Sequence, residues 1–233
     1  MSVVEKNMSL RDDVLAQAKE LSFNHTMEHS SEPITKDKIT RIIQQAVLSP
    51  TADNCQPFTF SWRENELLIY HSHLLATHPL NVRNIPSMLS LGCLVEAIDL
   101  SASEFSLDLK YEIFDILENK KSLCCRIVFN KSLRYPHKLL PALAERTTDR
   151  RLYTRVPLPL NLVADIENSE LPGVKIHLAG ELKSALKDYL LSSEKFLLEG
   201  DNLPCTLEWV RLTPNEISKT RDGMPWKSIG AHG

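Results

Sequence analysis

A polar segment bounded by two prolines, residues 49–58 (SPTADNCQPF), stops a helical pattern and starts a strand-like one. Pro50 cannot continue the preceding helix, and Pro57 favours an extended conformation for Gln56. The segment is therefore predicted to be a rigid polar turn. Its Thr51, Asn54 and Gln56 side chains can donate to and accept from the edge of a flat heteroaromatic ligand. The alternative is an ordinary helix-to-strand connection, because most such loops only connect elements.

Hydrophobic spacing divides the first 135 residues into helices and strands. The Pro86 position fits the first turn of a long central helix, and Thr35 fits an N-cap. Two short alternating stretches around the turn at residues 63–65 fit a hairpin. The predicted elements are helices at 9–25, 36–48 and 86–105, and strands at 58–62, 66–71, 107–114 and 123–129.

The pattern changes after Pro136. A helical stretch precedes residues 145–153, prolines 157 and 159 interrupt the chain, and the last thirty residues are predicted to be rich in loops. The remaining predicted elements are helices at 160–168 and 181–198 and a strand at 174–178. Together the elements predict an α+β fold, with a mostly antiparallel sheet flanked by helices.

Composition narrows the class of protein. The 233 residues are 42% hydrophobic and 24% charged, which is typical of a soluble globular chain. A net charge of −3 gives no general attraction to nucleic acid or to anionic membranes. The first residues lack the continuous apolar stretch of a secretory signal, so we expect no such signal, and we expect no run long enough to span a bilayer. Five cysteines without a CxxC pair indicate buried thiols in a reducing compartment, so we expect a cytoplasmic protein.

A phosphorylated ligand would have to be held by side chains. The 7 glycines include no GxGxxG or GxxxxGK arrangement. Arg146 and Arg150 stand four apart and would share one face of a helix, where their charges repel. Either the neighbouring Glu145 and Asp149 or an external dianion must offset that repulsion. A solvated salt-bridge surface is an equally good interpretation of this spacing alone.

Other chemistry has weaker signals. His71, His73 and His78 invite a metal site, but no acidic or cysteine ligand lies at a useful spacing, and we expect a solvated strand end there and no metal. Asp53 is interpreted as a turn residue. The absence of a GxSxG motif or a Cys-His nucleophile pattern argues against a hydrolase.

Two motifs resemble those of one flavoprotein family. Residues 49–58 resemble the SPSxxNxQPW signature of nitroreductase-like proteins, with Phe58 in place of tryptophan. Residues 146–150 (RTTDR) resemble the RRSxRxF motif that binds the FMN phosphate in that family. The resemblance implies that one group of residues holds the ring and ribityl chain and the other the phosphate. These are Pro50, Thr51, Asn54 and Gln56, and then Arg146, Thr148 and Arg150.

The arginine motif follows the polar loop, an order that resembles the two-lobed Acg-type branch of the family. This implies a nitroreductase-like lobe at residues 1–135 and a partial second lobe at 136–233, shortened at its C-terminus. The implied activity is hydride transfer from NAD(P)H through FMN to a nitroaromatic, quinone or similar small acceptor, with the flavin N5 rather than a protein group carrying the chemistry. Two alternatives stay open: a protein that sequesters flavin without turnover, and a remnant that binds no cofactor. A homodimer also stays open.

Overall fold

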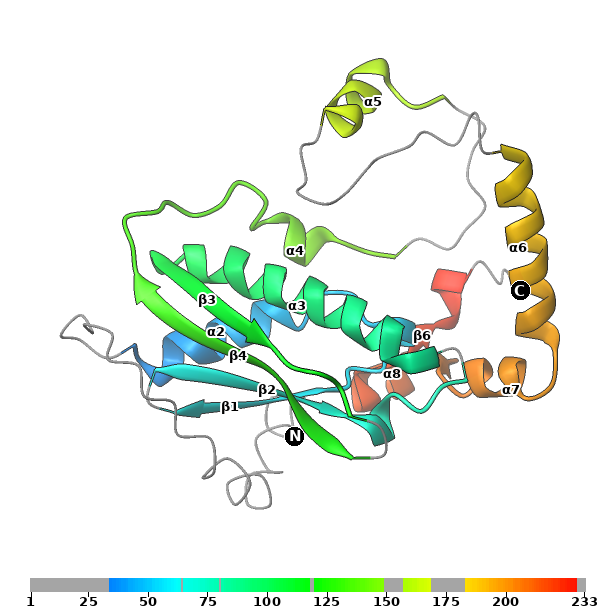
Figure 1. The fold of residues 1–233 in the computed structure, drawn as a ribbon, viewed down its shortest axis with the longest axis horizontal. Helices are drawn as coiled ribbons and strands as arrows, with labels where there is room; N and C mark the ends of the chain where they lie inside the picture. The colour runs from blue at the N-terminus through cyan, green and yellow to red at the C-terminus, as the bar shows by residue number, and fades with distance from the viewer. Residues whose placement is uncertain are drawn as a thin grey trace.

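A computed structural model describes residues 34–63, 65–79, 81–117, 120–148, 157–168 and 183–229. The fold is α+β, with helices packed on an antiparallel sheet and an extended C-terminal part (Figure 1). The predicted helix at 9–25 and strand at 174–178 lie outside the described residues.

Four antiparallel strands form the main sheet, in the order β1-β2-β4-β3. The predicted hairpin is confirmed: Phe58 pairs with His71, and Trp62 pairs with Leu67. The side chains of Phe58, Phe60 and Trp62 therefore share one face with Leu67 and Ile69, as period-two alternation requires. The strands are β1 (Phe58–Arg63), β2 (Glu66–Ser72), β3 (Leu107–Ile113) and β4 (Lys121–Lys131).

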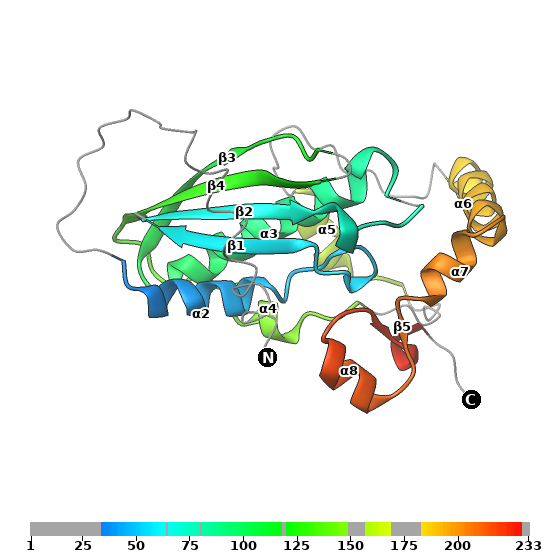
Figure 2. The same cartoon turned by 90° about the horizontal axis from the view of Figure 1, so that it is seen from below.

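Two predicted helices, α2 (Lys36–Ala46) and α3 (Ile85–Ser103), pack on that face (Figure 2). The Thr35 hydroxyl caps α2 by accepting from the Lys38 amide at 3.4 Å, and Pro86 lies in the first turn of α3. Apolar side chains of both helices meet those of the strands in one core. Its fully buried members include Ile39, Ile42, Leu67, Ile69, Leu91, Ile98 and Ile127.

The central helix corrects one expectation. Residues Val82–Ser103 form a 22-residue stretch that is long and apolar enough to cross a membrane by length and composition, although no such run was expected. About half of its strongest window, 56%, is buried inside the protein. Packing against the sheet on one side and α2 on another accounts for the buried apolar residues of this helix.

Apart from α6, the C-terminal part is made of short elements. Helices α5 (Leu160–Glu167) and α6 (Lys183–Leu198) confirm the predicted ones, while α4 (Ala142–Glu145) is a single turn. The predicted loop-rich ending is wrong. Thr213 caps α8 by accepting from the Glu216 amide, and two short parallel strands pair nearby. These elements are α7 (Asn202–Leu207), β5 (Val210–Arg211), α8 (Pro214–Thr220) and β6 (Met224–Pro225).

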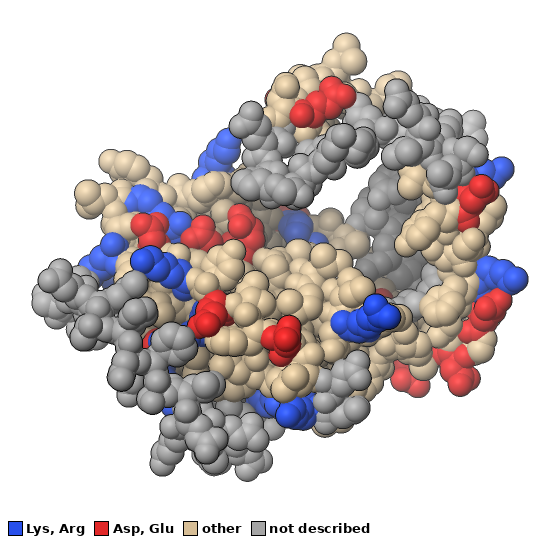
Figure 3. Space-filling view, viewed as in Figure 1, with Lys and Arg blue, Asp and Glu red and all other residues tan. Residues whose placement is uncertain are grey.

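Charged side chains of both signs are mixed on the surface, and most of the thiols are buried in the core. On the face shown in Figure 3, acidic and basic side chains are interspersed with uncharged ones. All five cysteines are free thiols. Cys55, Cys124 and Cys125 are buried as expected, whereas Cys93 is exposed on α3. The expectation of buried thiols is thus correct for three of the five.

Candidate functional site

The polar loop folds as a turn in an unusual backbone conformation. A single 3-10 turn, η2 (Ala52–Asn54), follows Thr51. Asp53, Asn54 and Gln56 have φ values of 48°, 55° and 50°, in the left-handed region. The extended conformation predicted for Gln56 is therefore wrong. Asp and Asn tolerate this region better than other residues with a Cβ, so the cost, roughly 1–3 kcal/mol, falls mainly on Gln56, and surrounding contacts must hold it there.

The predicted ligand-binding side chains bond to one another within the loop. The backbone N–H of Gln56 donates to Thr51 Oγ1 at 3.2 Å, and the side-chain Nε2 of Gln56 donates to Asn54 Oδ1 at 2.7 Å. Asn54 Nδ2 donates to the Gly223 carbonyl at 3.0 Å. These bonds fix the orientation of both amide groups. Pro50, which begins the turn, is exposed.

Arg146 lies at the entrance to this loop. Its guanidinium donates from Nη2 to the Leu48 carbonyl at 3.1 Å and from Nη1 to Thr148 Oγ1 at 3.2 Å. Leu48 is 98 positions away in the chain and directly precedes the loop. A cation beside the carbonyls that end α2 also has a favourable interaction with the helix dipole. The structure therefore brings two of the predicted phosphate-binding residues to the polar loop.

The helical reasoning behind the arginine pair needs correction. Helix α4 ends at Glu145, and Arg146 has φ −59° and ψ 127°, which is an extended rather than a helical conformation. The four-residue spacing therefore does not place Arg146 and Arg150 on one helix face. Arg150 lies outside the described residues.

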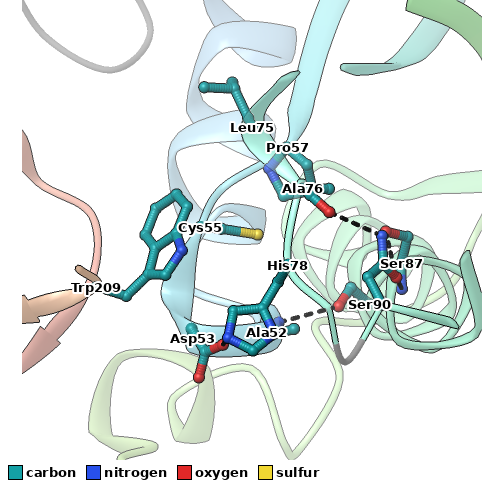
Figure 4. Close-up of a pocket in the computed structure, with 11 residues that line it drawn as sticks. Ala52, Asp53, Cys55, Pro57, Leu75, Ala76, His78, Ser87, Ser90 and Trp209 are labelled. Carbon is teal, nitrogen blue, oxygen red and sulfur yellow. Dashed lines mark hydrogen bonds and ion pairs between the residues drawn. The ribbon is translucent and has the colours of Figure 1, made fainter. Parts of the chain in front are cut away.

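A small hollow of about 20 Å³, room for about one water molecule, lies beside the loop (Figure 4). Loop residues Asp53 and Cys55 line one side, α3 another, and Trp209 from the C-terminal part a third. Burial, together with the negative charge of Asp53, raises the pKa of the Cys55 thiol to about 12. The Cys55 thiol is therefore expected to stay protonated at neutral pH, which makes it a weak nucleophile. Other lining residues are Pro57, Leu75, Ala76, His78, Ser87 and Ser90.

His78 joins three segments at the edge of this hollow. Its Nε2 lies 3.1 Å from Thr206 Oγ1 on α7 and 3.9 Å from Asp53 Oδ2. Asp53 lies in a turn, as predicted, and also faces this imidazole (Figure 4). Sequence reasoning missed the site roles of His78, Trp209 and Gly223. No local pattern could reveal them, because their partners lie far away along the chain.

His71 is fully buried, so the expectation of a solvated strand end is wrong. The Ser87 hydroxyl donates to Asn81 Oδ1, so Ser87 Oγ accepts from His71 Nε2 at 3.0 Å. Burial, and secondarily the nearby His73, lowers the pKa of His71 to about 4. Among the described residues, no group of three or more His, Cys, Asp and Glu side chains could hold a metal ion.

Comparison with known proteins gives likenesses of structure only. No family model and no curated protein matches this chain. A structure from Streptococcus pneumoniae aligns at 13% identity and TM-score 0.35, over 60% of this chain and 94% of its own. A second, from Clostridium difficile, aligns at 14% and 0.35, over 47% and 84%. These neighbours are nitroreductase family proteins.

A third likeness is to the NADPH:FMN oxidoreductase from Vibrio harveyi complexed with NAD⁺. It aligns at 12% identity and TM-score 0.37, over 79% of this chain and 94% of its own. Two further nitroreductase-like neighbours were solved in complex with FMN. Identities and TM-scores this low carry no argument about the ligand or activity of this chain.

Proposed function

We propose that this chain is an FMN-dependent oxidoreductase that passes hydride from NAD(P)H to a nitroaromatic, quinone or similar electron-poor acceptor. The observation that carries the proposal is the contact between Arg146 and the Leu48 carbonyl. This contact, between residues 98 positions apart, brings the motif at 146–150 to the residue just before the motif at 49–58, and the two motifs were matched to the phosphate and the ring of one cofactor. A chance pair of motifs has no reason to be adjacent in the fold.

The residues at this place have the chemistry that FMN needs. A guanidinium pairs with a phosphate through strong, charge-assisted hydrogen bonds. The described contacts of Arg146 use two of its five N–H groups, and the hydroxyl of Thr148 lies beside it. Arg150 would add a second guanidinium. This donor set suits a dianionic phosphate held by side chains, as the lack of a glycine-rich loop requires.

The polar loop would hold the rest of the cofactor. Pro50 and Thr51 would contact the ring, while Asn54 and Gln56, already oriented by their mutual hydrogen bond, would face the ring edge and the ribityl chain. When bound, FMN supplies the hydride-accepting and hydride-donating centre. The chain supplies binding and orientation, and the proposal assigns no catalytic acid or base. We further propose that the protein is cytoplasmic and works without nucleic acid or membrane, and that a homodimer is the form to test.

Paired titrations with FMN and riboflavin test the phosphate assignment. The double variant Arg146→Ala/Arg150→Ala should weaken FMN binding by at least about tenfold, because each lost charge-assisted contact is worth about 1.5–3 kcal/mol. Riboflavin lacks the phosphate, so its affinity should not change. Arg41→Ala removes a positive charge from α2 at its pair with Glu104 and is the matched control. Equal loss of FMN and riboflavin affinity would contradict the assignment.

Anaerobic mixing with NADH or NADPH tests turnover. Rapid loss of the flavin absorbance, restored by a quinone or nitroaromatic compound, is the expected result. A bound flavin that resists reduction by both nucleotides would instead identify a flavin-sequestering protein.

A further inference from the structure

The loop at residues 51–56 needs an external support. Three of its residues with a Cβ have left-handed backbones, and within the loop the described hydrogen bonds are local ones between residues 51 and 56. Such conformations persist where surrounding structure over-determines them. Helix α3 supplies one such contact, because the Ala52 backbone amide donates to Ser90 Oγ at 3.3 Å. The C-terminal part supplies the contacts to Asn54.

Gly223 makes two hydrogen bonds to one loop residue. The Gly223 amide donates to the Asn54 carbonyl at 3.1 Å, and Asn54 Nδ2 donates back to the Gly223 carbonyl at 3.0 Å. The two residues are 169 positions apart, and Gly223 is buried. Both the backbone and the side chain of Asn54 are therefore held by the same partner. Through its Oδ1, Asn54 then holds Gln56.

Only glycine fits at position 223. Its φ is +75°, and an added Cβ would lie 2.5 Å from the Trp209 carbonyl oxygen and 2.8 Å from the Arg211 guanidinium. The same Trp209 oxygen accepts from the Met224 amide at 2.7 Å, which joins β5 to β6. This close approach of backbones places the Gly223 peptide against the loop.

An ion pair between Arg211 and Asp222 fixes the turn that contains Gly223. Arg211 donates to Asp222 Oδ1 from Nη2 at 2.9 Å and from Nε at 3.1 Å, and its Nη1 donates to the Glu208 carbonyl at 2.7 Å. The Arg211 side chain is only 11% exposed, so water competes little for these bonds. The guanidinium also lies over the Trp209 ring, with 5.7 Å between Cζ and the ring centroid.

We propose that residues 208–225 form a clamp that sets the ligand-binding conformation of the polar loop, with Arg211, Asp222 and Gly223 as positioning residues that act through Asn54 and Gln56. The effect on flavin rests on the proposed function, whereas the effect on the loop does not. No described hydrogen bond joins Arg211 or Asp222 to a loop residue that would contact flavin. Loss of either side chain would therefore affect flavin binding only through the conformation of the loop.

Hydrogen exchange tests the clamp without any ligand. Gly223→Ala should speed exchange of the Asn54, Cys55 and Gln56 amides by about tenfold or more, because the clamp detaches and the loop opens more often. Exchange in β2 should not change. Gly200→Ala is the matched control: Gly200 also has a positive φ, +57°, but an added Cβ there meets nothing within 4 Å. Unchanged loop exchange in a folded Gly223→Ala protein would overturn the proposal.

A second pair of variants gives a graded test that does not depend on Gly223→Ala folding. Asp222→Ala removes the acceptor of Arg211, whereas Asp222→Asn keeps an oxygen at the same place. Loop exchange should increase more in Asp222→Ala than in Asp222→Asn. The FMN dissociation constant should rise in the same order, and by about tenfold in Asp222→Ala, with a shifted absorption spectrum of the bound flavin. Equal loop exchange in wild type and Asp222→Ala would overturn the clamp.

The two proposals fail in different ways. Wild-type protein that binds no FMN but shows faster loop exchange in the clamp variants contradicts the proposed function and supports the clamp. FMN binding that is equally tight in wild type and Asp222→Ala, with unchanged loop exchange, contradicts the clamp and leaves the flavin assignment standing.

Discussion

The regions before and after Lys131 use apolar residues in opposite ways. From residue 34 to Lys131, helices α2 and α3 and the four strands bury their apolar faces against one another. Among the described residues after Lys131, Met224 is the one apolar side chain that is buried, with 5% of its surface exposed. Helix α6 instead exposes Tyr189 and Leu190, by 69% and 63%. The first region is stabilised by a core, and the second by a few specific contacts.

The difference shows where hydrophobic burial ends and polar contacts take over. Gly223 and Arg146 connect the second region to the polar loop through hydrogen bonds to Asn54 and Leu48. Such a bond contributes about 1 kcal/mol when both groups are neutral and about 1.5–3 kcal/mol when one is charged, and the many side chains of a core together contribute far more. These bonds can nevertheless set the conformation of a loop that the core only anchors at its two ends.

Truncating one core residue should give the largest effect and tests the contrast directly. Ile98→Ala, at a fully buried position on α3, should lower the free energy of unfolding by about 3–4 kcal/mol through lost burial and a residual cavity. Leu190→Ala on α6 should cost less than about 1 kcal/mol because that side chain is exposed. Urea denaturation measures both. Similar losses would mean that the second region has a core of its own.

Acid should weaken the first region through His71, with a somewhat smaller effect. The folded-state pKa of about 4 lies below the ordinary 6.5, so only the unfolded state takes up a proton as the pH falls through that window. The stabilisation is complete above pH 6.5 and is lost towards pH 4. Between pH 7.5 and 4.5 the loss should be about 2–3 kcal/mol.

His71→Gln isolates this contribution. A glutamine can still donate to the Ser87 hydroxyl but does not titrate in this range, so the pH dependence of the unfolding free energy should become flatter by that amount. The same pH dependence in the variant and the wild type would show that other groups account for the acid sensitivity.

A glycine substitution on α3 should give the smallest effect, and it tests whether anything packs against that position of the helix. Gly92→Ala should raise the unfolding free energy by about 0.5–1 kcal/mol, because alanine is a better helix former and the added Cβ meets nothing within 4 Å. Thermal denaturation detects this change. A destabilised Gly92→Ala protein would indicate that another molecule or segment packs closely at this position.

Sequence patterns predicted the first region well because its helices and strands bury one face each, and that burial produces the hydrophobic periodicity in the sequence. Helices α2 and α3, the hairpin and the Thr35 cap all agree with local signals. In the second region α5 and α6 were predicted, but the packing of the last residues was not. The left-handed Gln56 was also missed, because Pro57 argues locally for an extended residue while the contacts among Thr51, Asn54 and Gly223 hold another conformation.

For the candidate site, motifs predicted the residues but geometry supplied their arrangement. Thr148 was selected by resemblance alone, and Arg146 by resemblance and by a helical spacing that the structure does not have. Their position beside Leu48 depends on how the fold brings the residues after α4 next to the residues after α2. His78 and Trp209 reach the hollow through contacts that no short sequence window contains.

The most direct measurement is the visible absorption spectrum of freshly purified protein, with any flavin released by heat and identified by chromatography. We expect a bound flavin spectrum with FMN as the released species. If the cofactor is lost on purification, we expect a higher melting temperature on adding FMN than on adding riboflavin. A colourless protein whose melting temperature does not respond to FMN would contradict the proposed flavin site, and the two motifs would then mark ancestry rather than a working site.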